Sequence, residues 1–240
     1  MKPTVGTIFY TLLSYVLLVP IFIVWAIPFL IVVITPRRWL LKSRFFYWFA
    51  DFFYWTLLKL SFLPILYKGK NNLPKGPAVY VANHQSSLDI PVVGNLLQRK
   101  PHIWMAKKEL MDTWFLRFVL PNIAVLVDMS TPTKGMRSLV KIIRMVKEYD
   151  LSVIFFPEGG RYVDGRIHDF FAGFAILAKK ARLPVVPIYI KNLNKVYPPD
   201  SFWVYYNQVD VVIGEPLHMQ KDEGERDFTD RVRSWFLKQE

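Results

Sequence analysis

The sequence contains no cysteine among its 240 residues, and its only histidines are His84, His102, His168 and His218. Without cysteine the chain can form no disulfide, no thiolate nucleophile and no cysteine-ligated zinc or iron–sulfur centre. The four histidines are scattered, and none falls in an H-E-x-x-H arrangement or a comparable ligand spacing. We therefore predict that the protein holds no metal and needs no cofactor.

Charge is absent from Pro3 to Pro36, a stretch of 34 residues. A helix needs about 20 apolar residues to cross the core of a bilayer. Pro20 and Pro28 would kink such a helix, and the excess length can tilt or lie in the membrane interface. A cleavable signal peptide fits poorly, because the stretch is too long and no small-residue cleavage site follows it. Whether the segment crosses the membrane or re-enters one leaflet stays open.

Basic and aromatic residues follow this apolar stretch. The segment RRWLLKSR at 37–44 carries four basic residues, which the positive-inside tendency places on the cytoplasmic side. Residues 45–66 are rich in aromatics, as at a membrane interface, with only Asp51 and Lys59 charged. We therefore predict that residues 1–66 form a membrane anchor of two helical segments. A buried helical hairpin in a soluble protein is the alternative.

The net charge of +12 requires an explanation in a chain that is 52 % hydrophobic. An anionic membrane surface and anionic substrates are the favoured partners. A basic nucleic-acid binder would concentrate its charge in one patch and would rarely carry a long uncharged apolar run. Residues 1–66 alone hold six basic residues and one acidic residue. We expect a lipid bilayer and no nucleic acid as partner; charge that merely keeps an apolar chain soluble is the alternative.

The composition changes beyond residue 66. The segment YKGKNNLPKGP at 67–77 is rich in lysine, glycine, asparagine and proline, which indicates a loop at a domain boundary. Downstream, short runs of β-branched residues alternate with stretches of helical period. The expected strands are 78–82, 102–106, 123–127, 152–156, 185–190 and 209–214, and the expected helices are 86–97, 133–149, 169–181 and 227–238. Residues 67–240 are therefore predicted to form an α/β domain, a mixed sheet flanked by helices, on the cytoplasmic side of the membrane.

Two polar turns follow strands of this expected sheet. NHQSSLD at 83–89 comes after the strand 78–82, and PEGGR at 157–161 comes after the strand 152–156. In open α/β sheets, ligand sites lie beyond the carboxyl ends of the strands. The two turns are therefore expected to face a common pocket.

The first turn places His84 and Asp89 five residues apart. On one unbroken helix this interval would leave the side chains about 140° apart, so they can meet only across a turn. A neutral imidazole accepts a proton near pH 7, and a carboxylate on its far nitrogen would fix the tautomer. Asp89 has an alternative structural role, closing a capping box with Ser86 at the start of a helix. The two roles are compatible.

This pair has no obvious protein nucleophile to activate. The chain has no cysteine and no G-x-S-x-G elbow. Ser86 and Ser87 lie too near His84 in the sequence to be favoured nucleophiles. If the pair is catalytic, it activates a hydroxyl that the substrate brings.

The second turn carries groups suited to an anion. Gly159 and Gly160 can take positive φ and turn backbone N–H groups toward an anion or an oxyanion. Arg161 offers a planar fork that suits a phosphate, and Glu158 can hold the loop or bind substrate hydroxyls. The segment lacks the G-K-[ST] ending of a nucleotide-binding loop, which disfavours nucleotide hydrolysis. A tight turn with a surface arginine is the alternative.

NHQSSLD and FPEGGR, together with KKEL at 107–110, LPVVPI at 183–188 and IGEP at 213–216, resemble the 1-acylglycerol-3-phosphate acyltransferase family. The order and spacing of these blocks are similar to that family from about residue 66 to residue 217. The family also carries an N-terminal membrane-bound helical module, in keeping with the predicted anchor.

The resemblance implies a reaction and a set of site residues. His84 would deprotonate the free hydroxyl of a lysophospholipid acceptor, Asp89 would orient His84, and the hydroxyl would attack an acyl thioester directly. The thioester would be acyl-CoA or acyl carrier protein, used as a substrate. The implied substrate-binding residues are Glu158, Gly159, Gly160, Arg161, Lys107 and Lys108.

Two positions depart from the family pattern. Gly160 stands where relatives commonly have threonine or serine, and Met129 follows Asp128 where they often have arginine. Arg117 and Lys134 are candidates to replace that arginine. The alternatives are an acyltransferase for another lysophospholipid, and a non-catalytic lipid-binding protein that retains the fold. An intact pair of His84 and Asp89 argues against the second.

Overall fold

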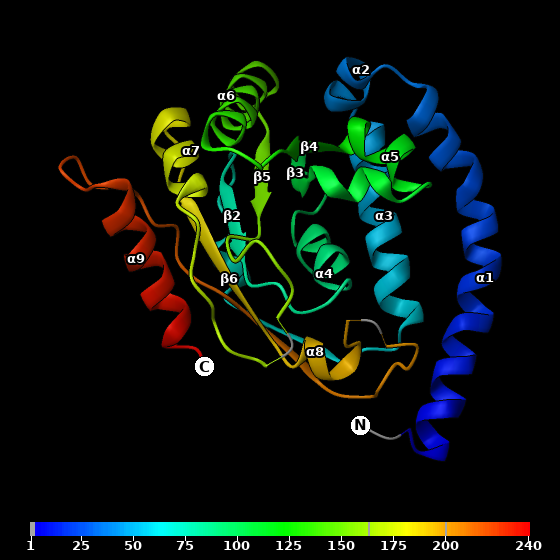
Figure 1. Cartoon of the computed structure of the whole chain (residues 1–240). Coiled ribbons are helices and arrows are strands. Elements are labelled where there is room, and N and C mark those ends of the chain that lie inside the picture. The colour runs from blue at the N-terminus through cyan, green and yellow to red at the C-terminus, as the bar shows by residue number, and fades with distance from the viewer. Residues whose placement is uncertain (1–2, 163, 200) are drawn as a thin grey trace.

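The fold is built on a sheet whose strands mostly run in one direction. The computed structural model describes residues 3–162, 164–199 and 201–240 (Figure 1). In these residues the sheet has seven strands, in the order β1-β7-β6-β2-β5-β3-β4. Neighbouring strands are parallel except β6 and β7, which are antiparallel. The predicted α/β fold with a mixed sheet is confirmed.

All the strands that the β-branched runs predict are present. The strands are β1 (Ile65–Lys68), β2 (Val79–Ala82), β3 (His102–Lys107), β4 (Ala124–Val127), β5 (Ser152–Phe155), β6 (Val185–Lys191) and β7 (Val209–Ile213). Among the strands in the described residues, only β1 is not predicted from the sequence. It has four residues, it directly follows an aromatic segment, and it lies at the edge of the sheet, where it pairs with β7.

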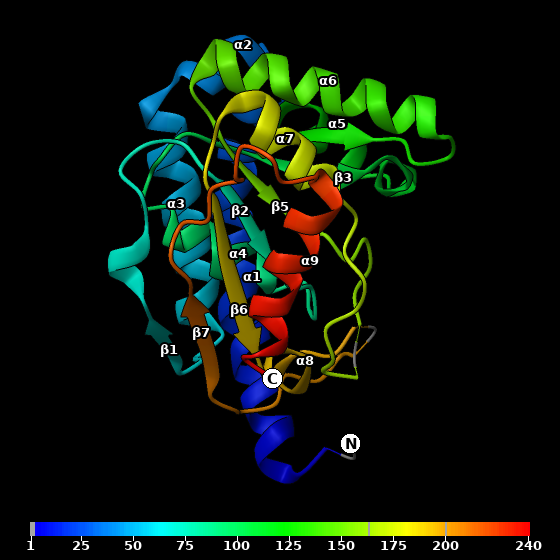
Figure 2. The ribbon, with the colours of Figure 1, turned by 90° about the vertical axis from the view of Figure 1, so that its left-hand side faces the viewer.

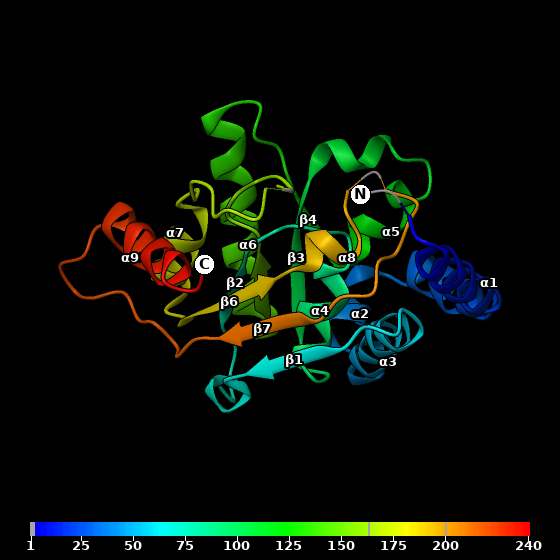
Figure 3. The same cartoon turned by 90° about the horizontal axis from the view of Figure 1, so that it is seen from below.

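Helices cover both faces of the sheet. They are α1 (Val5–Ile34), α2 (Arg37–Lys42), α3 (Arg44–Leu60), α4 (Asp89–Leu96), α5 (Leu116–Ile123), α6 (Pro132–Tyr149), α7 (Gly173–Ala181), α8 (Leu193–Val196) and α9 (Glu225–Leu237). Helices α6, α7 and α9 lie on one face, α3 and α4 lie on the other, and α1 lies outside α3 (Figures 1 and 3). Figure 2, seen from the side of α9, shows α9 in front of the sheet.

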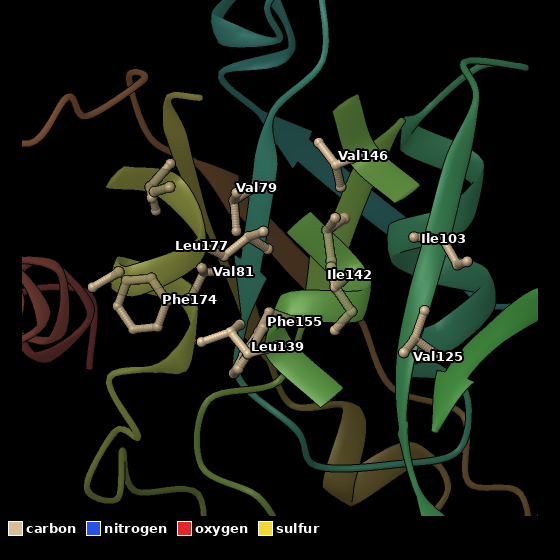
Figure 4. Packing of buried hydrophobic residues seen from close by; sticks show 14 of the residues in the cluster. Val79, Val81, Ile103, Val125, Leu139, Ile142, Val146, Phe155, Phe174 and Leu177 are labelled. Atoms are coloured by element: carbon tan, nitrogen blue, oxygen red, sulfur yellow. The ribbon is translucent and has the colours of Figure 1, made fainter. Parts of the chain in front are cut away.

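Strand β2 is buried on both faces because it lies in the middle of the sheet. Val79 and Val81 point into the layer formed with α6 and α7 (Figure 4), whereas Tyr80 and Ala82 point toward α3 and α4. This alternation follows from the two-residue period of a strand. Each fully buried valine contributes about 1.5–3 kcal/mol to folding. The central position of β2 brings the turn after it to the middle of the sheet edge.

A chain of buried polar groups ties α3 to the sheet. The indole N–H of Trp104 donates to the Tyr54 hydroxyl oxygen at 3.0 Å, and that oxygen lies 3.4 Å from Nε2 of His102. Nδ1 of His102 lies 2.8 Å from the Lys100 carbonyl. Burial lowers the pKa of His102 to about 4, so the ring is neutral and suits these contacts. His102, which looks unremarkable in the sequence, is therefore a structural residue.

The predicted two-helix anchor is confirmed only in part. Among the described residues only α1 is long and apolar enough to cross a membrane. The second expected segment forms α3, which ends at Leu60, and its Tyr54 and Leu58 belong to the core of the α/β domain. Its opposite face exposes Phe45, Trp48, Phe52 and Trp55, whose neighbouring rings stack with centroids 5.8–5.9 Å apart. Helix α3 is thus amphipathic, and it bridges the domain and an exposed aromatic surface.

Helix α1 is attached to the domain near both of its ends. The Tyr15 hydroxyl donates to the Phe202 carbonyl at 2.9 Å, and Asn122 Nδ2 donates to the Val32 carbonyl at 3.0 Å. Most other side chains of α1 are exposed and apolar. Strand β1 includes residues on both sides of the expected domain boundary between residues 66 and 67. That division into two domains stays a prediction.

A close approach of α3 to α4 generates a stability prediction. A Cβ atom on Gly94 would lie 2.4 Å from the ring of the buried Tyr54. Gly94→Ala should therefore lower the free energy of unfolding by about 1–3 kcal/mol, since overpacking a filled core forces neighbouring groups to move. Gly76→Ala is the control, because no atom lies within 4 Å of a Cβ there. Thermal unfolding in detergent measures the difference, and equal melting temperatures for the two variants would contradict this packing.

Candidate active site

The predicted meeting of the two polar turns is confirmed. Strands β2 and β5 are adjacent and parallel, with Val81 opposite Phe155, so their carboxyl ends lie side by side. The His84 backbone N–H donates to Glu158 Oε1 at 3.0 Å, and the Tyr162 N–H donates to the His84 carbonyl at 3.1 Å. The turn after β2 and the turn after β5 therefore form one site.

Asn83 connects the end of β2 to the neighbouring strand β6. Its Nδ2 donates to the Ile190 carbonyl at 2.8 Å, and its Oδ1 accepts from the Ile190 N–H at 2.7 Å. The side chain is buried, so these paired bonds hold the start of the turn firmly. Sequence reasoning did not single out Asn83, although it is the first residue of the NHQSSLD motif.

Asp89 organises the first turn through one carboxylate oxygen. Oδ2 lies 2.6 Å from His84 Nδ1, and it accepts from the N–H groups of Gln85 at 2.6 Å and Ser86 at 2.8 Å. The bond from Ser86 is the reach-back half of the expected capping box. The other half is absent, because Ser86 Oγ donates to the Tyr197 carbonyl and accepts from the Leu88 N–H. Asp89 thus both closes the turn and contacts the imidazole, and α4 begins at Asp89.

The tautomer of His84 follows from its two neighbours. The guanidinium nitrogen Nε of Arg161 lies 3.2 Å from His84 Nε2 and can only donate, so Nε2 accepts and Nδ1 carries the proton. Nδ1–H then donates to the carboxylate of Asp89. One face of the ring stacks on Phe156, with centroids 4.1 Å apart and planes inclined by 14°. Asp89, Arg161 and Phe156 thus hold the ring in place. Its Nε2 atom is unprotonated, as the proton-accepting atom of a general base must be.

The buried side chain of Glu158 links three segments of chain at the site. Its Oε1 accepts from the His84 N–H and its Oε2 accepts from the His168 N–H at 3.3 Å. The carboxyl group is buried, and burial raises its pKa to about 7, although the two backbone donors act in the opposite direction. Glu158 therefore holds the loops together, in line with one of its two expected roles, and its carboxylate is occupied by backbone groups.

The two glycines of the second turn differ in conformation. Gly159 has a φ of +67°, and a Cβ there would meet the Phe171 ring at 2.7 Å. Its N–H closes a turn onto the Phe156 carbonyl at 3.2 Å. Gly160 does not have positive φ, and a Cβ there would lie 3.5 Å from the Tyr162 ring, an ordinary contact. The left-handed conformation expected for both glycines is therefore found only at Gly159, and Gly160 is not required as glycine.

Lys107 and Lys108 lie at the carboxyl end of β3, on the same sheet edge as His84 but beyond β5. In the described ranges neither lysine makes a polar contact with His84 or Glu158. Lys108 Nζ lies 3.3 Å from Asp128 Oδ2, and Lys134 Nζ lies 3.6 Å from the same oxygen. Hydrogen bonds from Ser130 lower the pKa of Asp128 well below its usual range, with a further contribution from the lysines.

Of the two candidates for the missing phosphate-side arginine, only Lys134 lies in this cluster. The guanidinium of Arg117 instead lies over the Phe118 ring, 4.8 Å from its centroid. Lys108 and Lys134 together form a second cationic group on the edge that carries Arg161. Among the residues with described positions, no three His, Asp or Glu side chains are close enough to hold a metal ion. That the reaction uses no metal stays a prediction.

Comparison with known proteins agrees with this geometry. The sequence model of the acyltransferase family matches residues 64–191, which contain both turns. The fold is similar to that of the 1-acyl-sn-glycerophosphate acyltransferase PlsC from Thermotoga maritima, with a TM-score of 0.78 and 22 % identity, covering 98 % of this chain and 95 % of that one.

Sequence relatives point the same way. The chain is 35 % identical to the chloroplastic 1-acyl-sn-glycerol-3-phosphate acyltransferase LPAT1 of Arabidopsis thaliana, over 70 % of this chain and 48 % of the relative. A Pseudomonas aeruginosa protein of the same enzyme name is 28 % identical, over 94 % of this chain and 88 % of the relative. The chain spans about half the length of the plant relatives that it matches. Since the family match covers more than half of the chain and includes both turns of the site, the protein belongs to the acyltransferase family.

Proposed function

We propose that the protein transfers a fatty acyl group from an acyl thioester to the free hydroxyl of 1-acylglycerol-3-phosphate, giving phosphatidic acid. The observation that carries this proposal is the arrangement of His84. Asp89 holds Nδ1, Phe156 holds the ring face, and Nε2 is unprotonated and accepts a hydrogen bond from Arg161. The names of the sequence relatives support the choice of acceptor.

In the proposed mechanism the acceptor itself supplies the nucleophile. Nε2 of His84 takes the proton from the lipid hydroxyl as the oxygen attacks the thioester carbonyl carbon. Asp89 stabilises the imidazolium that forms, because its carboxylate already accepts the Nδ1–H bond. The C–S bond then breaks, and the imidazolium returns its proton to the departing thiolate. The products are the diacyl lipid and a free thiol, with no covalent enzyme intermediate.

The acceptor phosphate is assigned to Arg161. Its guanidinium is exposed, lies next to the base, and makes no ion pair within 4 Å in the part of the chain that the structure describes. A guanidinium binds a phosphate through two parallel hydrogen bonds. Lys108 and Lys134 would attract the same anion, although Asp128 partly neutralises them. A different lysophospholipid is the alternative acceptor, because Met129 replaces the arginine that is common in the family pattern.

The donor is acyl-CoA or acyl carrier protein, and both are anionic. Helix α6 begins at the active edge of the sheet, and its exposed face carries Arg137, Lys141, Arg144 and Lys147. This face would attract either donor. A non-catalytic lipid-binding protein is the remaining alternative. It would have no need for the hydrogen bond that orients His84 on Asp89, so the geometry disfavours it.

The protein is further proposed to bind the membrane through α1 and the exposed aromatic face of α3. The two faces together expose many large apolar side chains, as at a lipid contact. Because the domain contacts α1 near both ends, a helix perpendicular to the membrane would draw the sheet into the bilayer. Helix α1 is therefore expected to lie along the membrane surface. The basic helix α2 at its end supports the cytoplasmic side.

The central test is the substitution His84→Ala. It should lower the rate of phosphatidic acid formation by at least ~10²-fold, because a positioned base contributes about 10²–10⁴. The assay supplies radiolabelled 1-acylglycerol-3-phosphate with each thioester donor and follows the diacyl product. His218→Ala is the matched control, since His218 is exposed and lies outside the site. Near wild-type turnover in a folded His84→Ala protein, or no transfer to this acceptor by the wild-type protein, would refute the proposal.

Glu158 generates a prediction about pH. Its folded pKa of about 7 lies above the ordinary value of 4.5, so the folded state binds its proton more tightly than the unfolded chain. Its stabilising contribution is therefore complete below about pH 4.5 and is lost as the pH rises through about 7. In Glu158→Gln this loss should be absent. The melting temperature of this variant should therefore fall less than that of the wild-type protein when the pH is raised from about 5 to about 8. Glu109→Gln, at an exposed position, should keep the wild-type slope.

Membrane binding can be tested on the exposed face of α1. The double substitution Ile23→Asp and Ile27→Asp places charge on two side chains that are each 69 % exposed, so folding should be unaffected. Retention on sedimented anionic vesicles should drop sharply, because charged groups are costly in the lipid phase. Met136→Asp with Val140→Asp, an equally spaced exposed pair on α6, is the control. Release of the wild-type protein by high salt without detergent would contradict embedding in lipid.

A further inference from the structure

The side chain of Arg161 donates a hydrogen bond to Nε2 of His84, the atom that must accept a proton in the proposed reaction. Its Nε lies 3.2 Å from His84 Nε2, and Nδ1 on the other side of the ring is bound to Asp89. The side chain of His84 is only 14 % exposed, and Phe156 covers one face of its ring. In this arrangement the lone pair of Nε2 is already used. No hydroxyl, whether of a lipid or of water, can give its proton to Nε2 until Arg161 moves.

The contact also opposes proton transfer electrostatically. Protonation of His84 with Arg161 in place would put two cations about one hydrogen bond apart. A guanidinium does not lose its proton in a protein, so Arg161 cannot relieve this repulsion by deprotonation. The base is therefore ineffective for as long as the contact persists.

Little holds Arg161 in this position apart from the imidazole. Its side chain is exposed, and within residues 3–162, 164–199 and 201–240 it has no carboxylate within 4 Å. A phosphate would offer it a bidentate, charge-assisted pair, which is stronger than a single bond to a neutral ring. An anionic acceptor can thus draw Arg161 off Nε2 and place its own hydroxyl nearby. Water has no comparable means of displacing it.

We propose that Arg161 blocks the base of His84 until the phosphate of the acceptor draws it away, so that the thioester is protected from hydrolysis while no acceptor is bound. This inference rests on the proposed function and adds to it a source of specificity. Arg161 is then a positioning residue with two roles, since it binds the acceptor phosphate and it shields Nε2.

The suppressed side reaction is a simple hydrolysis. Water would give its proton to Nε2 as its oxygen bonds to the thioester carbonyl carbon. The C–S bond would break, and the imidazolium would protonate the thiolate, leaving a free fatty acid and a free thiol. The reaction needs no other reactant than the donor and water.

The test measures cleavage of acyl-CoA in the absence of any lipid acceptor. Arg161→Ala should raise the rate of thiol and fatty acid release roughly tenfold or more, a fraction of the ~10²–10⁴ that a positioned base contributes. The double variant Arg161→Ala with His84→Ala should return to the background rate, which shows that the gain passes through the base. Arg166→Ala, at an exposed arginine of the following loop, should behave as wild type. The yield of phosphatidic acid from Arg161→Ala should fall at the same time.

A second measurement uses inorganic phosphate as the probe. Added phosphate should stimulate acyl-CoA hydrolysis by the wild-type protein, because it draws Arg161 away without supplying an alcohol acceptor, and it should have no effect on Arg161→Ala. If the wild-type protein makes phosphatidic acid but Arg161→Ala hydrolyses acyl-CoA no faster than wild type, the shielding role is wrong and the proposed function stands. If the wild-type protein makes no phosphatidic acid with either donor, both fail.

Discussion

The parallel pairing of β2 with β5 is the constraint on which the site depends. Val81 lies opposite Phe155, so the chain leaves both strands at the same edge and in adjacent positions. Residues that are more than seventy positions apart in the sequence are thereby brought within one hydrogen bond, as the contacts of His84 with Glu158 and Arg161 show. The burial of β2 on both faces holds this edge rigidly, and Asn83 extends the rigidity into the turn.

Two carboxylates divide the work of building the site. Asp89 binds the imidazole and two backbone N–H groups through a single oxygen, so a substitution at Asp89 would change both the charge next to the His84 ring and the shape of the turn. Among the described residues Glu158 accepts hydrogen bonds from two backbone donors, and these bonds hold the two loops together. Burial raises its pKa to about 7, which connects the stability of this loop junction with pH in the neutral range. The cationic residues Lys108, Lys134 and Arg161 are exposed, whereas both carboxylates are buried.

The sheet also separates two kinds of surface. Helices α1 and α3 expose apolar and aromatic side chains, whereas α6, on the opposite face of the sheet, exposes a row of cations. Since the polar edge lies between them, the proposed function has a lipid acceptor and an anionic donor approach this edge from different directions. Helix α3 serves both the core and the aromatic surface, with Tyr54 bound to Trp104 inside and Trp55 exposed outside. Helix α3 therefore cannot move independently of the sheet.

Local pattern alone determined much of this protein: six of the seven strands in the described residues, the four helices downstream of residue 66 that the pattern predicts, the long apolar helix, and the two motifs with His84, Asp89, Glu158 and Arg161. These features depend on nearest neighbours and on residue periods, which a sequence shows directly. The tertiary structure decided what depends on distant segments: the edge strand β1, the packing of α3 into the core, the ring of Phe156 on His84, the backbone partners of Glu158, and the placement of Lys107 and Lys108 beyond β5. Which groups meet at a sheet edge follows from strand order, and strand order is set by the burial of all the strands and helices together.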